Sequence, residues 1–183
     1  MLNRVEALQL LKNYVKNDKI IKHCLAVEAI MRKLANKFNE DEELWGLAGL
    51  LHDIDYELTA KDLSKHGIIA EEILKDKVPK KVLDAIKAHN ELTGFNCETK
   101  MSYALKASDQ VSGLIIATAL VMPSKKLAEV KVNSLIKKFK QKDFARSVNR
   151  EEILLCEKLG IPLKEFMEIS LKALQEIKEV LSL

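Results

Sequence analysis

The scarcity of glycine and proline is the feature that most constrains how this chain can fold. The sequence has six glycines and three prolines among 183 residues, about 5%, whereas these two residue types make up roughly 12% of an average protein. A sandwich or barrel of many short strands needs such residues at its turns, so their scarcity favours a few long elements with short connections. Apolar residues also recur at helical spacing through nearly the whole chain. The sequence therefore predicts an all-α fold.

The apolar pattern predicts a compact bundle of about eight to ten helices in a single domain, residues 1–183, since no repeat or linker interrupts it. Helices are expected over residues 8–15, 20–38, 41–51, 62–75, 79–89, 99–121, 124–140 (two short ones), 149–159 and from 162 to the C-terminus. The segment 124–183 is expected to pack on or over the rest.

Charge and cysteine content exclude several classes of protein. Lys and Arg number 30 against 27 Asp and Glu, a net charge of +3, which is too balanced for a protein that coats nucleic acid or an anionic membrane. The three cysteines (Cys24, Cys97 and Cys156) lie far apart and form no CxxC pair, as expected of reduced thiols in a cytoplasmic protein. The most apolar run, Val111 to Met122, is too short to span a bilayer and predicts a buried core helix. Neither a membrane nor an extended nucleic acid is expected as a partner, while self-association stays open.

Titratable residues interrupt the apolar stripes of the predicted helices. Asp109, for example, lies between Leu105 and Ile116 at helical spacing. The same holds for every histidine in the chain, so one aspartate and four histidines are predicted to point inward: Asp109, His23, His52, His66 and His89.

Two interpretations compete for these five residues. A single inward histidine is usually a hydrogen-bonded core residue, and a single inward aspartate is usually a cap or an ion-pair partner. Five in one small domain favour a metal site, because neutral imidazoles and carboxylates are natural ligands of divalent cations and the cation supplies the missing countercharge. Asp53 follows His52 directly, where the helical pattern fails, so both side chains can reach one metal near a helix end.

The chain resembles the HD-domain superfamily of metal-dependent phosphohydrolases over about residues 18–120. The matching segments are KHCLAVEAI at His23, GLAGLLHDID at His52 and Asp53, HGIIAEEIL from His66, IKAHN at His89 and ALKASD ending in Asp109. The resemblance implies an HD-like helical fold and a first metal held by four residues: His23, His52, Asp53 and Asp109. It also places His66 and His89 where binuclear members hold a second metal bridged by Asp53. These two histidines are either ligands of that metal or phosphate contacts, and with Asp53 they have catalytic roles.

Two positions depart from the pattern of the superfamily. The common motif HDIG, often followed by Lys, is here His52-Asp53-Ile54-Asp55-Tyr56, and the pair of adjacent histidines common in binuclear members is here His89-Asn90. The number of metals therefore stays open at one or two, and Mn, Fe, Co, Ni, Mg and Zn all remain possible.

The resemblance implies hydrolysis of a phosphate ester or anhydride in a small nucleotide-like substrate, by water that the metal activates. Two alternatives remain. Some proteins with this ligand order hold two irons and activate oxygen, and a third class is a non-catalytic regulatory module that binds metal or nucleotide.

Several other residues are candidates with two interpretations each. Lys106, Arg146 and Arg150 are predicted to contact substrate phosphates, the last two within a basic segment over residues 124–150 that is otherwise a solvated face. Asp55 is either an acceptor that orients a ligand histidine or a solvated loop acid. Tyr56 and Trp45 are either stacking surfaces for a base or core residues.

Overall fold

A computed structural model describes all 183 residues, and it confirms the all-α prediction. Eight helices have at least seven residues and three have four, which agrees with the predicted number. In chain order they are α1 (Arg4–Tyr14), α2 (Asp18–Phe38), α3 (Glu42–Leu51), α4 (Tyr56–Thr59), α5 (Ile68–Leu74), α6 (Lys80–His89), α7 (Lys100–Val121), α8 (Val132–Lys140), α9 (Arg150–Ile153), α10 (Leu163–Glu176) and α11 (Lys178–Leu181).

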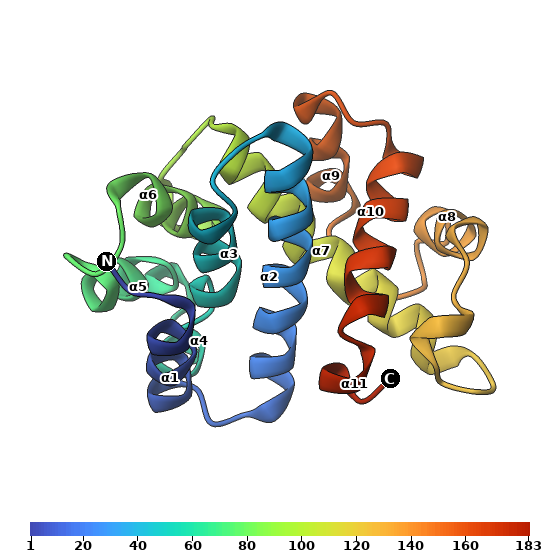
Figure 1. The fold of residues 1–183 in the computed structure, drawn as a ribbon, viewed down its shortest axis with the longest axis horizontal. Helices are drawn as coiled ribbons and strands as arrows, with labels where there is room; N and C mark the ends of the chain where they lie inside the picture. The colour runs from blue at the N-terminus through green and yellow to red at the C-terminus, as the bar shows by residue number, and fades with distance from the viewer.

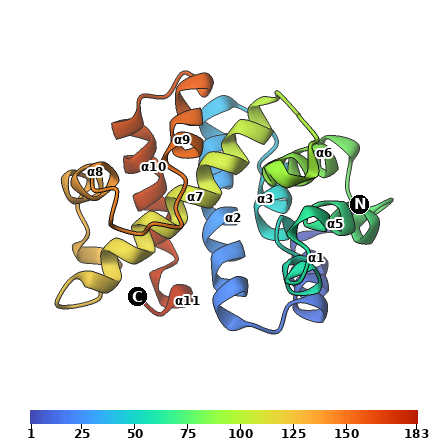
Figure 2. The same ribbon diagram turned by 180° about the vertical axis from the view of Figure 1, so that it is seen from behind.

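The two longest helices, α2 and α7, lie in the middle of the molecule (Figure 1). The earlier helices α1, α3, α5 and α6 lie on one side of them, and the later helices α8, α9 and α10 lie on the other, as the view from behind also shows (Figure 2). α2 packs against α3 and α10, while α7 packs against α6, α8 and α9. The central pair therefore contacts both halves of the chain.

One continuous apolar core extends through both sides of this arrangement, from Ala7 in α1 to Leu181 in α11. Trp45 is buried in it against the ring of Phe38, at 6.0 Å between ring centroids, so it is a core residue and offers no stacking surface. Burial of each large side chain stabilises the fold by about 1.5–3 kcal/mol. Side chains from distant segments therefore fix how α2, α3 and α7 lie.

α7 contains the apolar run for which the sequence predicted a buried core helix. The helix is long and apolar enough to cross a membrane by length and composition alone, but 56% of its most apolar window is buried within the structure. Its buried residues include Leu105, Val111 and Leu114. α7 thus behaves as the core helix that the sequence predicted.

A glycine lets α3 lie against α2 at very short range. A Cβ atom on Gly49 would lie 2.8 Å from the backbone of Glu28, closer than two such atoms can approach. α3 is buried along its length from Leu44 to Leu51, and His52 follows at its C-terminal end. This close contact brings the end of α3 next to α2, which carries His23.

The helix expected over residues 62–75 is the clearest departure from the sequence prediction. A 3₁₀ turn covers Leu63–Lys65, and α5 begins only at Ile68. Gly67 between them has φ +91°, a conformation that residues with a side chain rarely adopt and that breaks the helix. His66 therefore precedes the helix on whose inward face it was predicted to lie. Similarly, the helix expected over 149–159 is α9 followed by a 3₁₀ segment, Leu154–Leu159.

Candidate metal centre

The structure brings together the six residues that the sequence singled out as ligands. They come from five places in the chain: His23 from α2, His52 and Asp53 from the end of α3, His66 from the turn before α5, His89 from the last residue of α6, and Asp109 from α7. Five of them, all except His52, line a cavity of about 580 Å³. His52 is fully buried behind them. A cavity of this size suits a small-molecule ligand.

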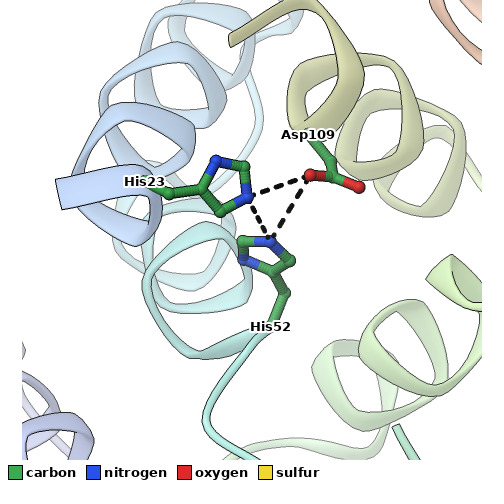
Figure 3. Close-up of side chains that lie close together, drawn as sticks. All are labelled: His23, His52 and Asp109. Carbon is green, nitrogen blue, oxygen red and sulfur yellow. Dashed lines mark hydrogen bonds and ion pairs between the residues drawn. The ribbon is translucent and has the colours of Figure 1, made fainter. Parts of the chain in front are cut away.

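Three of these residues form a first group at the meeting point of α2, α3 and α7 (Figure 3). His23 Nε2 lies 3.2 Å from His52 Nε2 and 3.0 Å from Asp109 Oδ1. His52 Nε2 lies 3.8 Å from the same oxygen of Asp109. Two imidazole nitrogens and a carboxylate oxygen thus converge on one point.

A second group lies around Asp53. Its Oδ1 atom is 3.2 Å from His66 Nε2 and 3.6 Å from His89 Nε2, and these two nitrogens are 3.0 Å from each other. Asp53 also faces the first group, because its Oδ1 lies 3.5 Å from His52 Nε2 and its Oδ2 lies 3.7 Å from His23 Nε2. Asp53 therefore lies between the two groups, where a bridging carboxylate would lie.

Backbone carbonyls orient two of the histidines. His52 Nδ1 lies 2.8 Å from the carbonyl oxygen of Gly49, and His89 Nδ1 hydrogen-bonds to the carbonyl oxygen of Ile86. A carbonyl oxygen only accepts hydrogen bonds, so in each ring Nδ1 carries the proton. The Nε2 atoms are then the ones presented to the centre.

His66 is oriented by a buried carboxylate instead. Its Nδ1 lies 2.8 Å from Oδ1 of Asp55, whose Oδ2 accepts hydrogen bonds from the backbone N–H groups of Gly67 and Ala70 at 2.8 and 2.9 Å. Asp55 is fully buried, which excludes the alternative of a solvated loop acid. Of its two predicted roles, the structure shows the one in which it orients a histidine.

His23 and Asp109 are linked through residues of α7. Ser112 Oγ donates to the carbonyl oxygen of Asp109 at 2.8 Å and lies 3.2 Å from His23 Nδ1, from which it accepts. The side-chain amide of Gln110 donates to Asp109 Oδ2 at 2.9 Å. One oxygen of Asp109 is therefore held from behind while the other faces the two histidines.

The chemistry of this donor set fits a divalent cation. When Nδ1 of each ring carries the proton, the lone pairs of His66 and His89 point at each other across 3.0 Å, and those of His23 and His52 across 3.2 Å. Such pairs repel unless a proton or a cation lies between them. Neutral imidazoles with two carboxylates are the ligands that divalent metals prefer, so the six residues fit one or two such ions.

The electrostatics of the centre favour positive charge. Burial by itself lowers the pKa of His52, but the carboxylates of Asp53 and Asp109 outweigh burial and raise that pKa to about 9. For His66 burial is likewise outweighed by Asp53 and Asp55, which raise its pKa to about 9. Burial opposes the ionisation of Asp53 and Asp109, yet the neighbouring histidines hold the pKa of both below its usual range. The carboxylates thus remain charged and attract protons or a metal.

The walls of the cavity above the centre are mostly polar. Tyr56 lines one side, and its ring lies edge to face with that of His66, with 5.5 Å between centroids. Of the two aromatic residues considered as stacking surfaces, only Tyr56 faces the cavity. The remaining lining residues outside the centre are Lys19, Ile20, Asn90, Glu91, Leu92, Gln110, Ser147, Asn149 and Glu152.

The structure places the three basic residues predicted to contact substrate outside the lining of the main cavity. Arg150 does not line the cavity, because its guanidinium donates to five backbone carbonyl oxygens, those of Phe139, Gln141, Phe144, Ala145 and Val148. Arg146 is 79% exposed and pairs only with Asp143, since the segment before α9 is a series of turns rather than a helix. Lys106 lines a neighbouring hollow instead of the main cavity.

Glu152 and Gln110 are two of the cavity residues that the sequence analysis missed. Glu152 is buried against the cavity, and it shares a helical spacing with the buried residues Cys156 and Leu159. The rule that singled out the histidines, a titratable residue on an apolar stripe, would have found it. Gln110 carries no such signal, because an amide next to Asp109 is common on a helix surface.

A comparison with protein families matches the HD domain to residues 20–119 of this chain. The matched range contains all six residues of the metal centre. It ends within α7, so the helices from α8 onward lie outside it.

Comparison with curated proteins finds similarity to several proteins named ribonuclease Y. The chain is 30% identical over 102 residues to that of Lawsonia intracellularis, which covers 55% of this chain and 19% of the relative. It is 36% identical over 72 residues to that of Acholeplasma laidlawii, covering 39% and 14%, and 38% identical over 76 residues to that of Aster yellows witches'-broom phytoplasma, covering 41% and 14%. The chain therefore spans less than one fifth of the length of these relatives.

No solved structure matches the chain. The family match nevertheless covers more than half of its residues and includes every side chain of the metal centre. On this evidence the chain belongs to the HD-domain family, part of a superfamily of metal-dependent phosphohydrolases.

Proposed function

We propose that this protein is a metal-dependent phosphohydrolase that cleaves a phosphate ester or anhydride bond in a small, nucleotide-like substrate. One observation carries the proposal: four histidines and two aspartates from five places in the chain meet beneath a cavity of about 580 Å³. A purely structural cluster of buried polar groups needs no such cavity above it.

Each of the two groups of residues would hold one metal ion. His23, His52, Asp53 and Asp109 would hold a first divalent ion, and His66 and His89 with Asp53 would hold a second. Such ions polarise phosphoryl oxygens and lower the pKa of water. The protein keeps each Nδ1 protonated, so that every Nε2 stays aimed at the centre.

His66 has a second possible role when only the first group holds a metal. Its Nδ1–H is held by Asp55, and the carboxylates of Asp53 and Asp55 favour a second proton on Nε2. His66 lines the cavity, and this Nε2–H, whose nitrogen lies 3.2 Å from Asp53 Oδ1, would donate a hydrogen bond to a phosphate oxygen of the substrate.

Metal analysis followed by a substrate screen tests the proposal. The protein is purified without chelator or metal resin, its metals are quantified, and nucleotides are assayed with Mn, Fe, Co, Ni, Mg and Zn. We expect release of phosphate or nucleoside that is lost in Asp109→Ala and kept in Asp143→Ala, a matched control whose carboxylate is exposed and does not line the cavity. Absence of hydrolysis with every metal, together with bound iron and oxygen consumption, would support the di-iron alternative instead.

A second candidate function is cleavage of a phosphodiester bond in RNA. It is favoured by the similarity of the HD region to proteins named ribonuclease Y. A labelled oligoribonucleotide assayed beside mononucleotides separates the two candidates. We expect the mononucleotides to be cleaved faster, because the centre lies at the bottom of a cavity.

We also propose a cytoplasmic location, supported by three cysteines that are all free of disulfides. A regulatory module that binds metal without turnover is the remaining alternative. Retained metal binding with no hydrolysis and no oxygen consumption would favour it.

A further inference from the structure

The charged side chains that line the cavity outside the metal centre are more acidic than basic. They are Lys19, Glu91 and Glu152. Lys19 is an exposed residue of the first turn of α2, whereas Glu152 is only 8% exposed and belongs to the wall itself. A chain of several phosphates needs several cations along its length. Outside the metals, this cavity offers one.

Carboxylates also outnumber basic groups in the hollow next to the cavity. This second hollow, of about 300 Å³, shares Glu91, Asn149 and Glu152 with the first. Its charged lining consists of four carboxylates and two ammonium groups, on Glu91, Glu98, Glu151, Glu152, Lys106 and Lys158. The ammonium group of Lys158 lies over the ring of Tyr103, 5.0 Å from its centroid. The space into which a substrate extends away from the metals is therefore acidic as well.

Glu152 is held at a fixed position relative to the metal centre by a chain of hydrogen bonds. Gln110 donates to Asp109 Oδ2 at 2.9 Å, and its side-chain oxygen accepts from the backbone N–H of Asn149 at 2.9 Å. Asn149 Oδ1 in turn accepts from the backbone N–H groups of Glu151 and Glu152 at 3.0 and 3.4 Å, which caps α9. A metal ligand and the Glu152 backbone are thus connected through two side chains.

The carboxylate of Glu152 has no basic group within 4.0 Å. Burial raises its pKa to about 7, and Asp109 and Glu91 act in the same direction, while Lys106 and Gln110 oppose the shift. A buried carboxyl group without an ion-pair partner gains most from a hydrogen-bond donor placed next to it. Above pH 7, where most of this carboxyl group is charged, a second phosphate placed there would be repelled.

From this arrangement we propose that the substrate carries a single phosphate and that Glu152 binds hydroxyl or amine donors of its remaining part. The phosphate occupies the metal centre, and the rest of the molecule lies along the wall formed by Asn149 and Glu152. Glu152 is then a specificity-determining residue. The inference rests on the proposed function, since it assumes that the phosphate lies at the metals.

The preference for one phosphate is tested on the wild-type protein loaded with metal. Binding of adenosine 5′-monophosphate and of adenosine 5′-triphosphate is measured by calorimetry, and hydrolysis of each is measured in parallel. We expect the monophosphate to bind at least about tenfold more tightly, because like charges at a binding surface oppose each other strongly. Equal or tighter binding of the triphosphate would overturn the inference.

The role of Glu152 is tested with Glu152→Gln, which keeps the shape of the side chain and removes its charge. We expect KM for the monophosphate to rise about tenfold, the size of a lost hydrogen bond to a charged group. The change in KM should exceed the change in kcat, and it should be smaller for phenyl phosphate, which offers no donor. The ratio of the affinity for the monophosphate to that for the triphosphate should also decrease.

Glu157→Gln is the matched control, because Glu157 is exposed, follows α9 and lines neither hollow, while its substitution changes the net charge equally. It should leave KM and the preference as in the wild type. An equal loss for the monophosphate and phenyl phosphate, or the same loss in Glu157→Gln, would overturn the assignment of Glu152. If no substrate is hydrolysed with any metal, the proposed function fails, whereas the binding comparison still decides this inference.

Discussion

The two halves of the metal centre are built on different kinds of support. His23 and Asp109 lie within the two longest helices, α2 and α7, of 21 and 22 residues. His66 lies in the turn before α5, a helix of seven residues. His89 is the last residue of α6, a helix of ten residues. Within a long packed helix the register alone fixes where a side chain points. In a turn or at the end of a helix, another residue must hold the side chain in its orientation.

Asp55 is that residue in the second half. It holds the imidazole of His66 and the first turn of α5 at once, through three hydrogen bonds of 2.8–2.9 Å. In the first half, Ser112 makes one contact with His23 and one with the backbone of its own helix. The comparison therefore predicts that loss of a supporting residue costs the second half more than the first.

The largest effect is expected where the halves meet. Asp53→Asn removes the charge between the two groups, and we expect loss of more than one bound metal equivalent where two are bound, with kcat/KM reduced at least about 1,000-fold. Elemental analysis measures the bound metal, and assays with the metal that gives the highest activity measure kcat/KM. Circular dichroism serves as the control for folding. Full metal content with near-normal activity would show that the halves do not share Asp53.

A dependence of metal affinity on pH is expected in both halves. A metal must displace protons from His52 and His66, whose pKa values are raised to about 9. The apparent affinity should therefore fall as pH decreases below 9, by about tenfold per unit for each proton displaced. Titrations of the metal-free protein at pH 6, 7 and 8 measure the slope. A flat profile over this range would contradict the raised pKa values.

Asp55→Ala should affect the second half selectively. We expect the affinity for the second metal to fall about 10–100-fold, the usual effect of removing the partner of a metal-binding histidine. The N–H groups of Gly67 and Ala70 would also lose their acceptor, which should lower the free energy of unfolding by about 2–5 kcal/mol. Calorimetric metal titration and urea unfolding test both. Equal weakening of both metals would break the comparison.

The smallest effect is expected from Ser112→Ala in the first half. The hydrogen bond to His23 and the one to the backbone carbonyl of Asp109 are lost, so we expect metal affinity to fall by about tenfold or less and the free energy of unfolding to fall by about 1–2 kcal/mol. Ser108→Ala is the control, because Ser108 is buried one turn earlier in α7 and its hydroxyl has no partner. A larger loss of metal affinity than in Asp55→Ala would show that the first half depends more on its supporting residue than the second half does.

The quality of the sequence prediction follows the same division. His23 and Asp109 were predicted to point inward from the apolar stripes of long helices, and the structure brings them to one point. His66 was predicted on a helix face but lies before the helix, because the conformation of Gly67 ends the regular pattern there. Periodicity carries information only where the chain is periodic.

Side chains outside long helices were predicted less well. Arg150 was predicted to bind phosphate from its charge, whereas the turns between residues 139 and 148 occupy its donors with carbonyl oxygens. No local pattern in the sequence shows where the carbonyl groups of an irregular segment will point. Glu152 was missed, although its spacing to Cys156 placed it on a buried face.

The sequence by itself determined the all-α class, the set of six candidate ligand residues and the inward direction of those on long helices, since composition and helical spacing are local properties. Only the tertiary structure decided that Asp53 lies between two groups of histidines, that Asp55 supports one of them, and that Glu152 rather than a basic residue forms the cavity wall. These relations join segments that are far apart in the chain. They depend on how helices pack, which is settled by the burial of the whole core and not by any one stretch of sequence.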